Sequence, residues 1–260
     1  MESVTSADGT VIGYSKTGSG PLLVLVHGST ADHTRWDAIT PRLAETFSVI
    51  AMDRRGRGAS GDAAEYEIQR EMEDVAAVVE SLGSPVALLG HSYGALCCLG
   101  AALLTDQIDR MVLYEPPLYT GLPFYPAGFP ERMQALIDDH KQEEALVTFF
   151  KEVVHMPEEE FSMYRKLPVW PTRVELAPTI PRELIHSQGY AIEPNDYEGW
   201  DVPSLLLLGG DSPAQFHNAI QRLDAILPNS RVVRLPGQQH VAMDTNKALF
   251  LEAVLGFVGA

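Results

Sequence analysis

The chain has 260 residues, 45% of them hydrophobic and 21% charged, which is the composition of a globular protein with a sizeable core. Its formal net charge of −16 argues against nucleic acid and anionic membrane surfaces as partners. The charge says little about a neutral small-molecule substrate, which is the partner we expect. No segment approaches the roughly 20 apolar residues of a membrane helix, and the N-terminus lacks the features of a signal peptide. We therefore expect a cytoplasmic protein, a monomer or homodimer, that does not bind membranes.

The two cysteines, Cys97 and Cys98, are neighbours in an apolar stretch. Adjacent cysteines in such a place make a poor structural bridge, and metal-ligand spacing is absent. We expect both to be small core residues in a reducing compartment. We expect no metal and no cofactor.

The beginning of the chain predicts an edge hairpin followed by a buried strand. Residues 2–16 alternate weakly around Asp8-Gly9, a hairpin signal, so we expect two antiparallel strands at the edge of a sheet. Residues 22–26 form a continuous apolar run, which is typical of a strand buried on both faces. A helix is expected next, over 33–46. Its apolar face would carry Trp36, Ile39 and Leu43.

A strand over 47–52 leads into a basic loop at 53–60. The loop could contact phosphate or nucleic acid, but its glycine spacing is wrong for a Walker loop and no Lys-Ser/Thr is present. We favour a structural loop in which Asp53 pairs with one of the arginines. Apolar positions at helical spacing then predict a helix over 66–82, which Gly83 ends.

Residues 86–104 predict a strand, a sharp turn and a buried helix. The turn carries Gly-His-Ser-Tyr-Gly at 90–94. A serine at such a turn is forced into a strained backbone conformation, and small residues two before and two after it let strand and helix approach. This is the G-x-S-x-G nucleophile elbow, with Ser92 as the candidate nucleophile. The alternative is a glycine-flanked turn serine without a chemical role.

After a strand over 111–114 the alternation of strand-like and helix-like stretches ends. Residues 131–154 are interpreted as a helical pair or a broken helix, and 158–167 as another helix. Four prolines are expected to break the chain after this helix: Pro168, Pro171, Pro178 and Pro181. Because no sheet strand is expected within 118–200, we interpret that stretch as a mainly helical insertion and not as an independent domain.

The last sixty or so residues return to alternating strands and helices. We expect strands over 203–209 and 231–235, helices over 214–226 and 247–258, and a loop at 236–240. Buried strands alternating with helices predict an α/β fold, with a mostly parallel central sheet flanked by helices on both faces.

Three features resemble the α/β-hydrolase fold superfamily over nearly the whole chain. They are His27-Gly28 after one strand, the Gly-His-Ser-Tyr-Gly motif after another, and the chain order Ser…Asp…His. The loop at 53–60 is similar to one common in the lid-bearing members. The resemblance implies a core formed by residues 1–117 and 201–260 and a helical lid formed by 118–200.

A serine hydroxyl is a weak nucleophile at neutral pH, so Ser92 needs a base, and the base needs an orienting acid. Of the eight histidines, His240 alone lies in a loop after a late strand, where the fold presents its catalytic histidine. The side chain of His91 would point away from Ser92, because neighbours at a sharp turn point apart. His27 is expected to shape the oxyanion loop.

For the acid, the resemblance assigns Asp211, just past the 203–209 strand, which would hold the tautomer of His240 and offset its positive charge. The alternative is Glu115, at the end of the 111–114 strand, where some members place the acid. We favour Asp211 because its context is the commoner one and because two prolines constrain Glu115. Asp244 is too near His240 in sequence for that geometry.

The backbone amides of Tyr93 and Ser29 are expected to form the oxyanion hole. Side chains of the insertion should shape the substrate pocket, although each could instead belong to the lid's own core. The predicted substrate-binding residues are His91, Trp36, Phe124, Met133, Phe150 and Trp170.

The leading interpretation is a serine hydrolase that cleaves a carboxylic ester, lactone or thioester of a small, largely apolar substrate through an acyl-enzyme on Ser92. A serine at the elbow disfavours haloalkane dehalogenase and epoxide hydrolase, whose relatives carry aspartate there. A carbon–carbon bond hydrolase, a cofactor-free haloperoxidase (perhydrolase) or a lyase would use the same triad and stays an alternative. A non-catalytic ligand receptor is disfavoured, because such relatives often lose a triad member.

Overall fold

A sheet of eight strands runs through the computed structural model, which describes residues 1–188, 190 and 192–259. The strands are β1 (Glu2–Thr5), β2 (Val11–Thr17), β3 (Leu22–Val26), β4 (Ser48–Met52), β5 (Val86–His91), β6 (Ile108–Tyr114), β7 (Ser204–Gly209) and β8 (Ser230–Leu235). Their order across the sheet is β1-β2-β4-β3-β5-β6-β7-β8. Strands β3 to β8 run parallel, whereas β2 is antiparallel to both β1 and β4. The predicted edge hairpin and mostly parallel sheet are confirmed.

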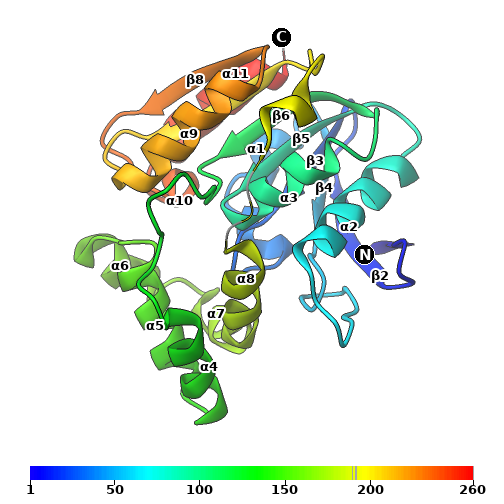
Figure 1. The fold of residues 1–260 in the computed structure, drawn as a ribbon. Helices are drawn as coiled ribbons and strands as arrows, with labels where there is room; N and C mark the ends of the chain where they lie inside the picture. The colour runs from blue at the N-terminus through cyan, green and yellow to red at the C-terminus, as the bar shows by residue number, and fades with distance from the viewer. Residues whose placement is uncertain (189, 191, 260) are drawn as a thin grey trace.

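Helices and short 3₁₀ turns flank the sheet (Figure 1). The helices are α1 (Thr40–Leu43), α2 (Ile68–Ser81), α3 (Tyr93–Ala101), α4 (Phe129–Asp138), α5 (Gln142–Glu152), α6 (Glu158–Tyr164), α7 (Trp170–Glu175), α8 (Ile180–Ser187), α9 (Ala214–Ile226), α10 (Ala242–Thr245) and α11 (Lys247–Val258). The 3₁₀ turns are η1 (His33–Trp36), η2 (Ala177–Thr179) and η3 (Pro194–Tyr197). Among the described residues, no helix has both the length and the apolar character needed to cross a lipid bilayer.

The central strands are buried because their sequences are apolar on both sides. Every residue of β4, β5 and β7 is buried, which is the pattern of parallel strands covered on both faces. Helix α3 is buried along its whole length and packs against β5 and α2. Helix α2 buries one apolar face, as its spacing predicts.

The register of the strands brings the loops after β5, β6 and β7 together. His91 at the end of β5 lies opposite Tyr114 at the end of β6, and Tyr114 lies opposite Leu207 of β7. Beyond the strands, the amide of Ser92 donates to the carbonyl of Tyr114 at 2.8 Å. The residues that come after these strands therefore meet at the carboxyl edge of the sheet, where open α/β sheets bind ligands.

Prolines divide the helices differently from the prediction at two places. The single helix expected over 33–46 is divided into η1 and the short α1, whose first turn contains Pro41. The stretch after α6 is broken into short helices as expected, with Pro168 in the turn before α7, but Pro171 and Pro181 lie in the first turns of α7 and α8 and so begin helices. Proline lacks an N–H, so it interrupts a helix interior but fits the first turn, where no intrahelical partner is needed.

The stretch between β6 and β7 contains helices and no strand within its described residues. It carries α4 to α8 together with η2 and η3, and α4 to α8 gather below the sheet in Figure 1. The helical pair expected over 131–154 corresponds to α4 and α5. We call residues 118–200 the helical segment. Residues 189 and 191 of the predicted insertion, and 260 of the predicted core, lie outside the described residues.

Candidate active site

Ser92 occupies a strained turn between β5 and α3. Its backbone angles are φ 55° and ψ −125°, a region that residues other than glycine rarely adopt. A Cβ on Gly94 would lie 2.3 Å from the His27 carbonyl oxygen, and one on Gly90 would lie 2.6 Å from the Ala95 Cα. Since neither position has room for a side chain, strand and helix can approach this closely only with glycine there. The turn has the geometry that the elbow motif predicts.

His240, in the loop after β8, turns its Nδ1 atom toward a buried carboxylate. That carboxylate belongs to Glu115, directly after β6, and its Oε2 atom lies 2.6 Å from Nδ1. Because a carboxylate accepts hydrogen bonds, Nδ1 is the donor in this pair, which in a neutral imidazole leaves the lone pair on Nε2. Glu115 is fully buried and has φ 47°, so it too stands in the left-handed region.

Groups at the end of β7 hold the Glu115 carboxylate in place. Its Oε1 atom accepts hydrogen bonds from the Gly209 amide at 2.7 Å and from the Ser212 hydroxyl at 2.5 Å. With His240 on Oε2, both carboxylate oxygens are hydrogen-bonded. A buried carboxylate requires such donors, because leaving water is costly for a charged group.

The structure corrects the prediction that Asp211 contacts His240. Asp211 is exposed in the turn after β7, where its amide donates to the Gln238 carbonyl at 3.0 Å. In the sheet, β6 lies directly beside β5, and β7 is one strand further away. The residue after β6 therefore leaves the sheet next to the Ser92 turn. Glu115, the alternative that the sequence left open, occupies the place expected for Asp211.

Side chains at the ends of β5 and β6 anchor the loop that carries His240. His91 donates through Nε2 to the His240 carbonyl at 2.8 Å, and the Tyr114 hydroxyl donates to the Gln239 carbonyl. Burial lowers the pKa of His91 well below its usual value, and the neighbouring His240 and Arg35 lower it further. Burial likewise raises the pKa of Tyr114 well above its usual value. His91 is thus a neutral donor and Tyr114 keeps the proton that it donates.

Ser29 and Tyr93, whose amides are predicted to form an oxyanion hole, are both close to Ser92. Tyr93 is the first residue of α3, where an N–H has no partner within the helix. Ser29 lies in the loop after β3, which approaches the elbow closely: a Cβ on Gly28 would lie 2.9 Å from the Cβ of Ser92. Ser29, Ser92 and Tyr93 all line the same cavity.

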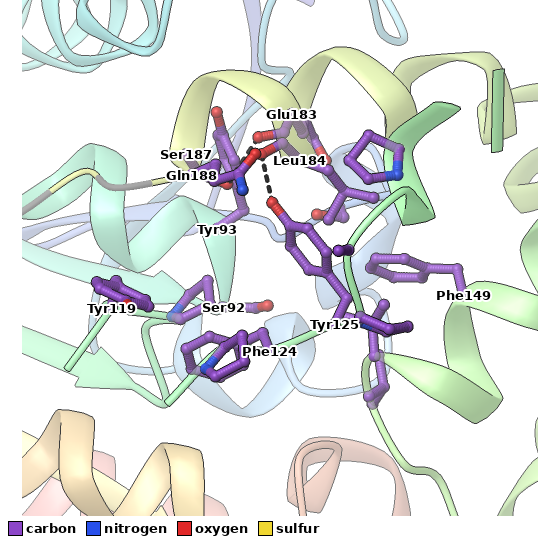
Figure 2. A pocket seen from close by; sticks show the side chains of 18 of the residues that line it. Ser92, Tyr93, Tyr119, Phe124, Tyr125, Phe149, Glu183, Leu184, Ser187 and Gln188 are labelled. Carbon is purple, nitrogen blue, oxygen red and sulfur yellow. Dashed lines mark hydrogen bonds between the residues drawn. The ribbon is translucent and has the colours of Figure 1, made fainter. Parts of the chain in front are cut away.

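This cavity has a volume of about 380 Å³ and is shown in Figure 2. Its size is that of an ordinary small-molecule site. The lining is mostly apolar and includes Tyr119, Phe124, Tyr125, Phe149, Val153, Val154, Leu184 and Phe216. Polar groups lie toward α8, where Glu183, Ser187 and Gln188 line the wall and the Tyr125 hydroxyl donates to the Leu184 carbonyl at 2.7 Å.

The predicted pocket residues divide into three groups. Phe124 lines the cavity. Phe150 and His91 line a smaller recess beside it. The remaining three lie in the core and line neither space: Trp36, Met133 and Trp170. Trp170 packs edge-on against Phe161 at 5.9 Å between ring centroids, so it belongs to the core of the helical segment. An apolar side chain gives the same sequence signal whether it faces a core or a cavity.

Sequence reasoning missed Tyr125, Phe149 and Phe216. Phe149 precedes Phe150 on α5, but successive helical residues point about 100° apart, so packing decides which one meets the cavity. The Phe216 ring on α9 stacks on the His240 ring at 4.6 Å between centroids. Its position early in the helix after β7 is the one signal that could have suggested it.

The basic loop after β4 is structural, but its arginines pair with distant acids and not with Asp53. Arg54 binds Glu71 of α2 at 2.6 and 2.7 Å and Glu183 of α8 at 2.5 Å. Arg57 also binds Glu183. We call these four residues the arginine–glutamate cluster: Arg54, Arg57, Glu71 and Glu183. The cluster joins the loop and α2 to the helical segment.

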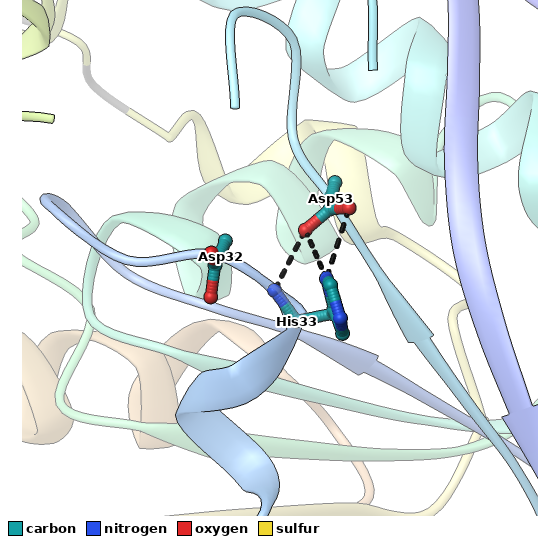
Figure 3. A group of neighbouring side chains, drawn as sticks. All are labelled: Asp32, His33 and Asp53. Atoms are coloured by element: carbon teal, nitrogen blue, oxygen red, sulfur yellow. Dashed lines mark hydrogen bonds and ion pairs between the residues drawn. The ribbon is translucent and has the colours of Figure 1, made fainter. Parts of the chain in front are cut away.

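Asp32, His33 and Asp53 form a group whose donor atoms all lie within 4.8 Å of one another (Figure 3). Asp53 accepts hydrogen bonds from the amide and the Nδ1 atom of His33 at 2.7 and 2.8 Å. Asp32 accepts one from the Thr34 amide at 2.9 Å. Each carboxylate thus accepts hydrogen bonds from groups of the protein, and the bonds between His33 and Asp53 connect η1 to the residue after β4.

Comparison with known proteins places the chain in a family. The sequence profile of the alpha/beta hydrolase family matches residues 23–253. An alpha/beta hydrolase from Sphaerobacter thermophilus DSM 20745, known as a crystal structure, is 34% identical, with 97% of this chain and 100% of that chain covered and a TM-score of 0.84. The 2-(acetamidomethylene)succinate hydrolase of Mesorhizobium japonicum is 25% identical over 94% of this chain and 90% of its own length. An esterase from Exiguobacterium antarcticum, 22% identical with 99% of each chain covered, shares the fold with a TM-score of 0.78.

The chain belongs to the alpha/beta hydrolase family. The family and the named relatives support hydrolytic activity. The mostly parallel sheet, with a strained serine after β5 and a histidine after β8, agrees with this assignment.

Proposed function

We propose that this protein is a serine hydrolase that cleaves a carboxylic ester, lactone or thioester through an acyl-enzyme on Ser92. The observation that carries the proposal is the buried 2.6 Å hydrogen bond between Glu115 and His240. His240 lines the same cavity as the strained Ser92. A nucleophile, a base and an orienting acid are the groups that acyl transfer requires.

In the first half-reaction Glu115 keeps the Nδ1 proton of His240 in place, and Nε2 removes the proton of Ser92 as its Oγ attacks the carbonyl carbon. The amides of Tyr93 and Ser29 donate to the oxygen that becomes negative. The intermediate then expels the alcohol, which takes the proton from His240, and leaves the acyl group on Ser92.

In the second half-reaction a water molecule gives its proton to His240 and attacks the acyl carbon. The intermediate collapses, Ser92 recovers its proton from His240, and the carboxylic acid leaves. Each proton that His240 accepts is returned in the same half-reaction, so the enzyme ends in its starting state.

The mostly apolar lining of the main cavity supports a small, largely apolar group on one side of the scissile bond. We propose that the helical segment, residues 118–200, is a lid over a core formed by 1–117 and 201–260. The arginine–glutamate cluster supports this assignment, because it ties α8 to the core at one place while α5 and α8 contribute to the cavity wall.

A fluorophosphonate probe tests the nucleophile. We expect it to label Ser92 in the folded protein, and we expect Ser92→Ala to abolish both labelling and the hydrolysis of short nitrophenyl esters. Ser162→Ala, which changes an exposed serine on α6, is the matched control and should behave like the wild type. Folded wild-type protein that the probe does not label would contradict the proposal.

A panel of esters, lactones and thioesters of varied acyl size would then define the substrate class. Because one relative is named for an acetamido-bearing substrate, short N-acyl amides are the second candidate and belong in the same panel. Cleavage of the amides with no turnover of any ester would favour that second candidate.

A further inference from the structure

A buried arginine of the helical segment lies beside Ser92, with no carboxylate partner among the residues that the structure describes. Arg173, in α7, is 4% exposed. Its Nη1 atom donates to the carbonyl and hydroxyl oxygens of Thr30 at 3.2 and 3.3 Å. Its Nε atom is buried and has no hydrogen-bond partner among the described residues. The guanidinium also lies over the Tyr164 ring, 4.7 Å from its centroid. A buried charge is normally paired with an opposite charge, since its removal from water is costly, and no described carboxylate is bonded to this one.

The nearby acids are engaged with other groups. Asp244 binds Arg35 through both carboxylate oxygens, at 3.1 and 2.8 Å. Asp32 accepts the hydrogen bond of the Thr34 amide. Burial lowers the pKa of Arg173 and the neighbouring Arg35 acts in the same direction, although an arginine stays protonated in proteins. Of these two arginines, Arg35 is directly paired with a carboxylate and Arg173 is bonded to Thr30.

Arg173 lines the small recess that opens beside Ser92. Ser29, Ser92 and His240 line both this recess and the main cavity, so the two spaces meet at the serine. Arg35 and Arg173 contribute to the recess lining, and no aspartate or glutamate of the described residues does. The recess has a volume of about 20 Å³. That is enough for one water molecule, and so for one oxygen atom of a carboxylate.

We infer that the substrate is a half-ester of a short dicarboxylic acid, whose free carboxylate enters this recess and pairs with Arg173. This inference rests on the proposed function. Ser92 and Arg173 line the same small recess, so only a few carbon atoms can separate the free carboxylate from the ester carbonyl that Ser92 attacks. A guanidinium binds a carboxylate through directed N–H donors. The Nε–H of Arg173 donates to no described residue. The products are the dicarboxylic acid and the alcohol.

The competing explanation is that Arg173 only supports the loop after β3. Its bonds to Thr30, which has φ 55°, would hold that loop whatever the substrate. The two explanations differ in one respect: loss of a loop support slows all substrates alike, whereas loss of an anion partner slows only anionic ones.

Monoethyl succinate and ethyl 4-oxopentanoate form a matched pair of substrates. Both are ethyl esters with the same two methylene groups, but the first ends in a carboxylate and the second in a neutral acetyl group. We expect wild-type kcat/KM, measured by acid release, to favour monoethyl succinate. Arg173→Gln should lower kcat/KM for monoethyl succinate by roughly 10- to 100-fold, and for the neutral ester by less than about threefold. Arg165→Gln, an exposed arginine of the same segment, should leave both values unchanged. Equal losses on the two esters in Arg173→Gln would overturn the inference.

A second measurement needs only the wild-type protein, in case Arg173→Gln fails to fold. We expect succinate to slow fluorophosphonate labelling of Ser92, and neutral succinamide to have no effect. Equal effects of the two compounds would overturn the inference. If Ser92 is labelled and the neutral ester is cleaved as well as monoethyl succinate, only this inference fails. If Ser92 is not labelled and neither ester is cleaved, the proposed function fails with it.

Discussion

At the scale of single residues, the site is built where the chain leaves a strand. Thr30, Ser92 and Glu115 come after β3, β5 and β6, and each has a φ between 47° and 55°. Such a conformation costs on the order of 1–3 kcal/mol for a residue other than glycine. It persists here because hydrogen bonds hold each residue. The Thr30 carbonyl accepts from Arg173, the Ser92 amide donates to Tyr114, and the Glu115 carboxylate accepts from three donors. The Ser92 side chain lines the cavity, and the Glu115 carboxylate behind it faces His240.

The choice between Glu115 and Asp211 can be decided by a pair of isosteric variants. Glu115→Gln should lower kcat by about 10³- to 10⁴-fold, because its amide can stabilise the wrong tautomer of His240. Asp211→Asn should stay within about twofold of the wild type, since Asp211 is exposed and Glu115 occupies the position beside Nδ1 of His240. Steady-state kinetics on one ester, with circular dichroism to show that both variants fold, makes the comparison. The reverse pattern of losses would restore Asp211 as the acid.

At the scale of elements, the arginine–glutamate cluster connects α2, the loop after β4 and α8. All four side chains are buried, and the two arginines and two glutamates balance in charge. A buried ion pair adds little net stability compared with apolar residues, but removal of one partner leaves an uncompensated charge. The cluster therefore acts as a specific attachment between the helical segment and the rest of the molecule. Arg182, whose Nη1 lies 2.7 Å from Asp62, adds a more exposed link at the same place.

The cluster predicts acid sensitivity. Burial by itself would raise the pKa of Glu71, but Arg54 and Arg57 outweigh it and lower that pKa from 4.5 to about 2. A carboxylate whose pKa is depressed by folding stabilises the protein fully above its unfolded pKa, and this contribution is lost as the pH falls toward the folded pKa. We expect the urea midpoint to fall between pH 4.5 and about 2 for this reason.

Glu71→Gln isolates that contribution. The variant should be less stable than the wild type at neutral pH and should lose less of its remaining stability on acidification. Glu73→Gln, on the same helix but in a partly exposed pair with Arg70, should keep the pH dependence of the wild type. Identical pH dependence of the urea midpoint in Glu71→Gln and wild type would argue against this role of the cluster.

At the scale of the whole molecule, one continuous core extends from the sheet into the helical segment. Helix α3 lies in the middle of it, between the sheet and α2, and is buried on every side. Both cysteines lie on this helix and are fully buried. Burial raises the pKa of the Cys97 and Cys98 thiols above the usual value.

These thiols should therefore be inert in the folded protein, because the thiolate is the reactive form and neither sulfur is accessible. We expect iodoacetamide at mildly alkaline pH to modify neither Cys97 nor Cys98 until the protein is unfolded, after which mass spectrometry should find both modified. Ser162→Cys provides an exposed thiol in the same protein as an internal reference. Modification of the native cysteines at the rate of that reference would show that the core opens readily.

Local signals in the chain were sufficient for most of the fold. Continuous apolar runs predicted β3, β4, β5 and β7 to within about a residue, because a parallel strand is buried on both faces and must be apolar throughout. Helix periodicity placed α9 and α11 at their observed bounds. The elbow could be found because its chemistry demands glycine at two positions close to Ser92, and His240 because it comes after a late strand.

The sequence by itself thus determined the class of fold, the strained serine and the histidine of this alpha/beta hydrolase, since each depends on residues adjacent in the chain. Only the tertiary structure decided that Glu115 faces His240, that Phe149 and Phe216 line the cavity, and that Arg173 lies beside Ser92 with no carboxylate bonded to it within the described part of the chain. These facts depend on which strands are neighbours in the sheet and on how α5, α7 and α9 are turned when they pack. Spacing along the chain does not encode such contacts, because they join residues that lie far apart in sequence.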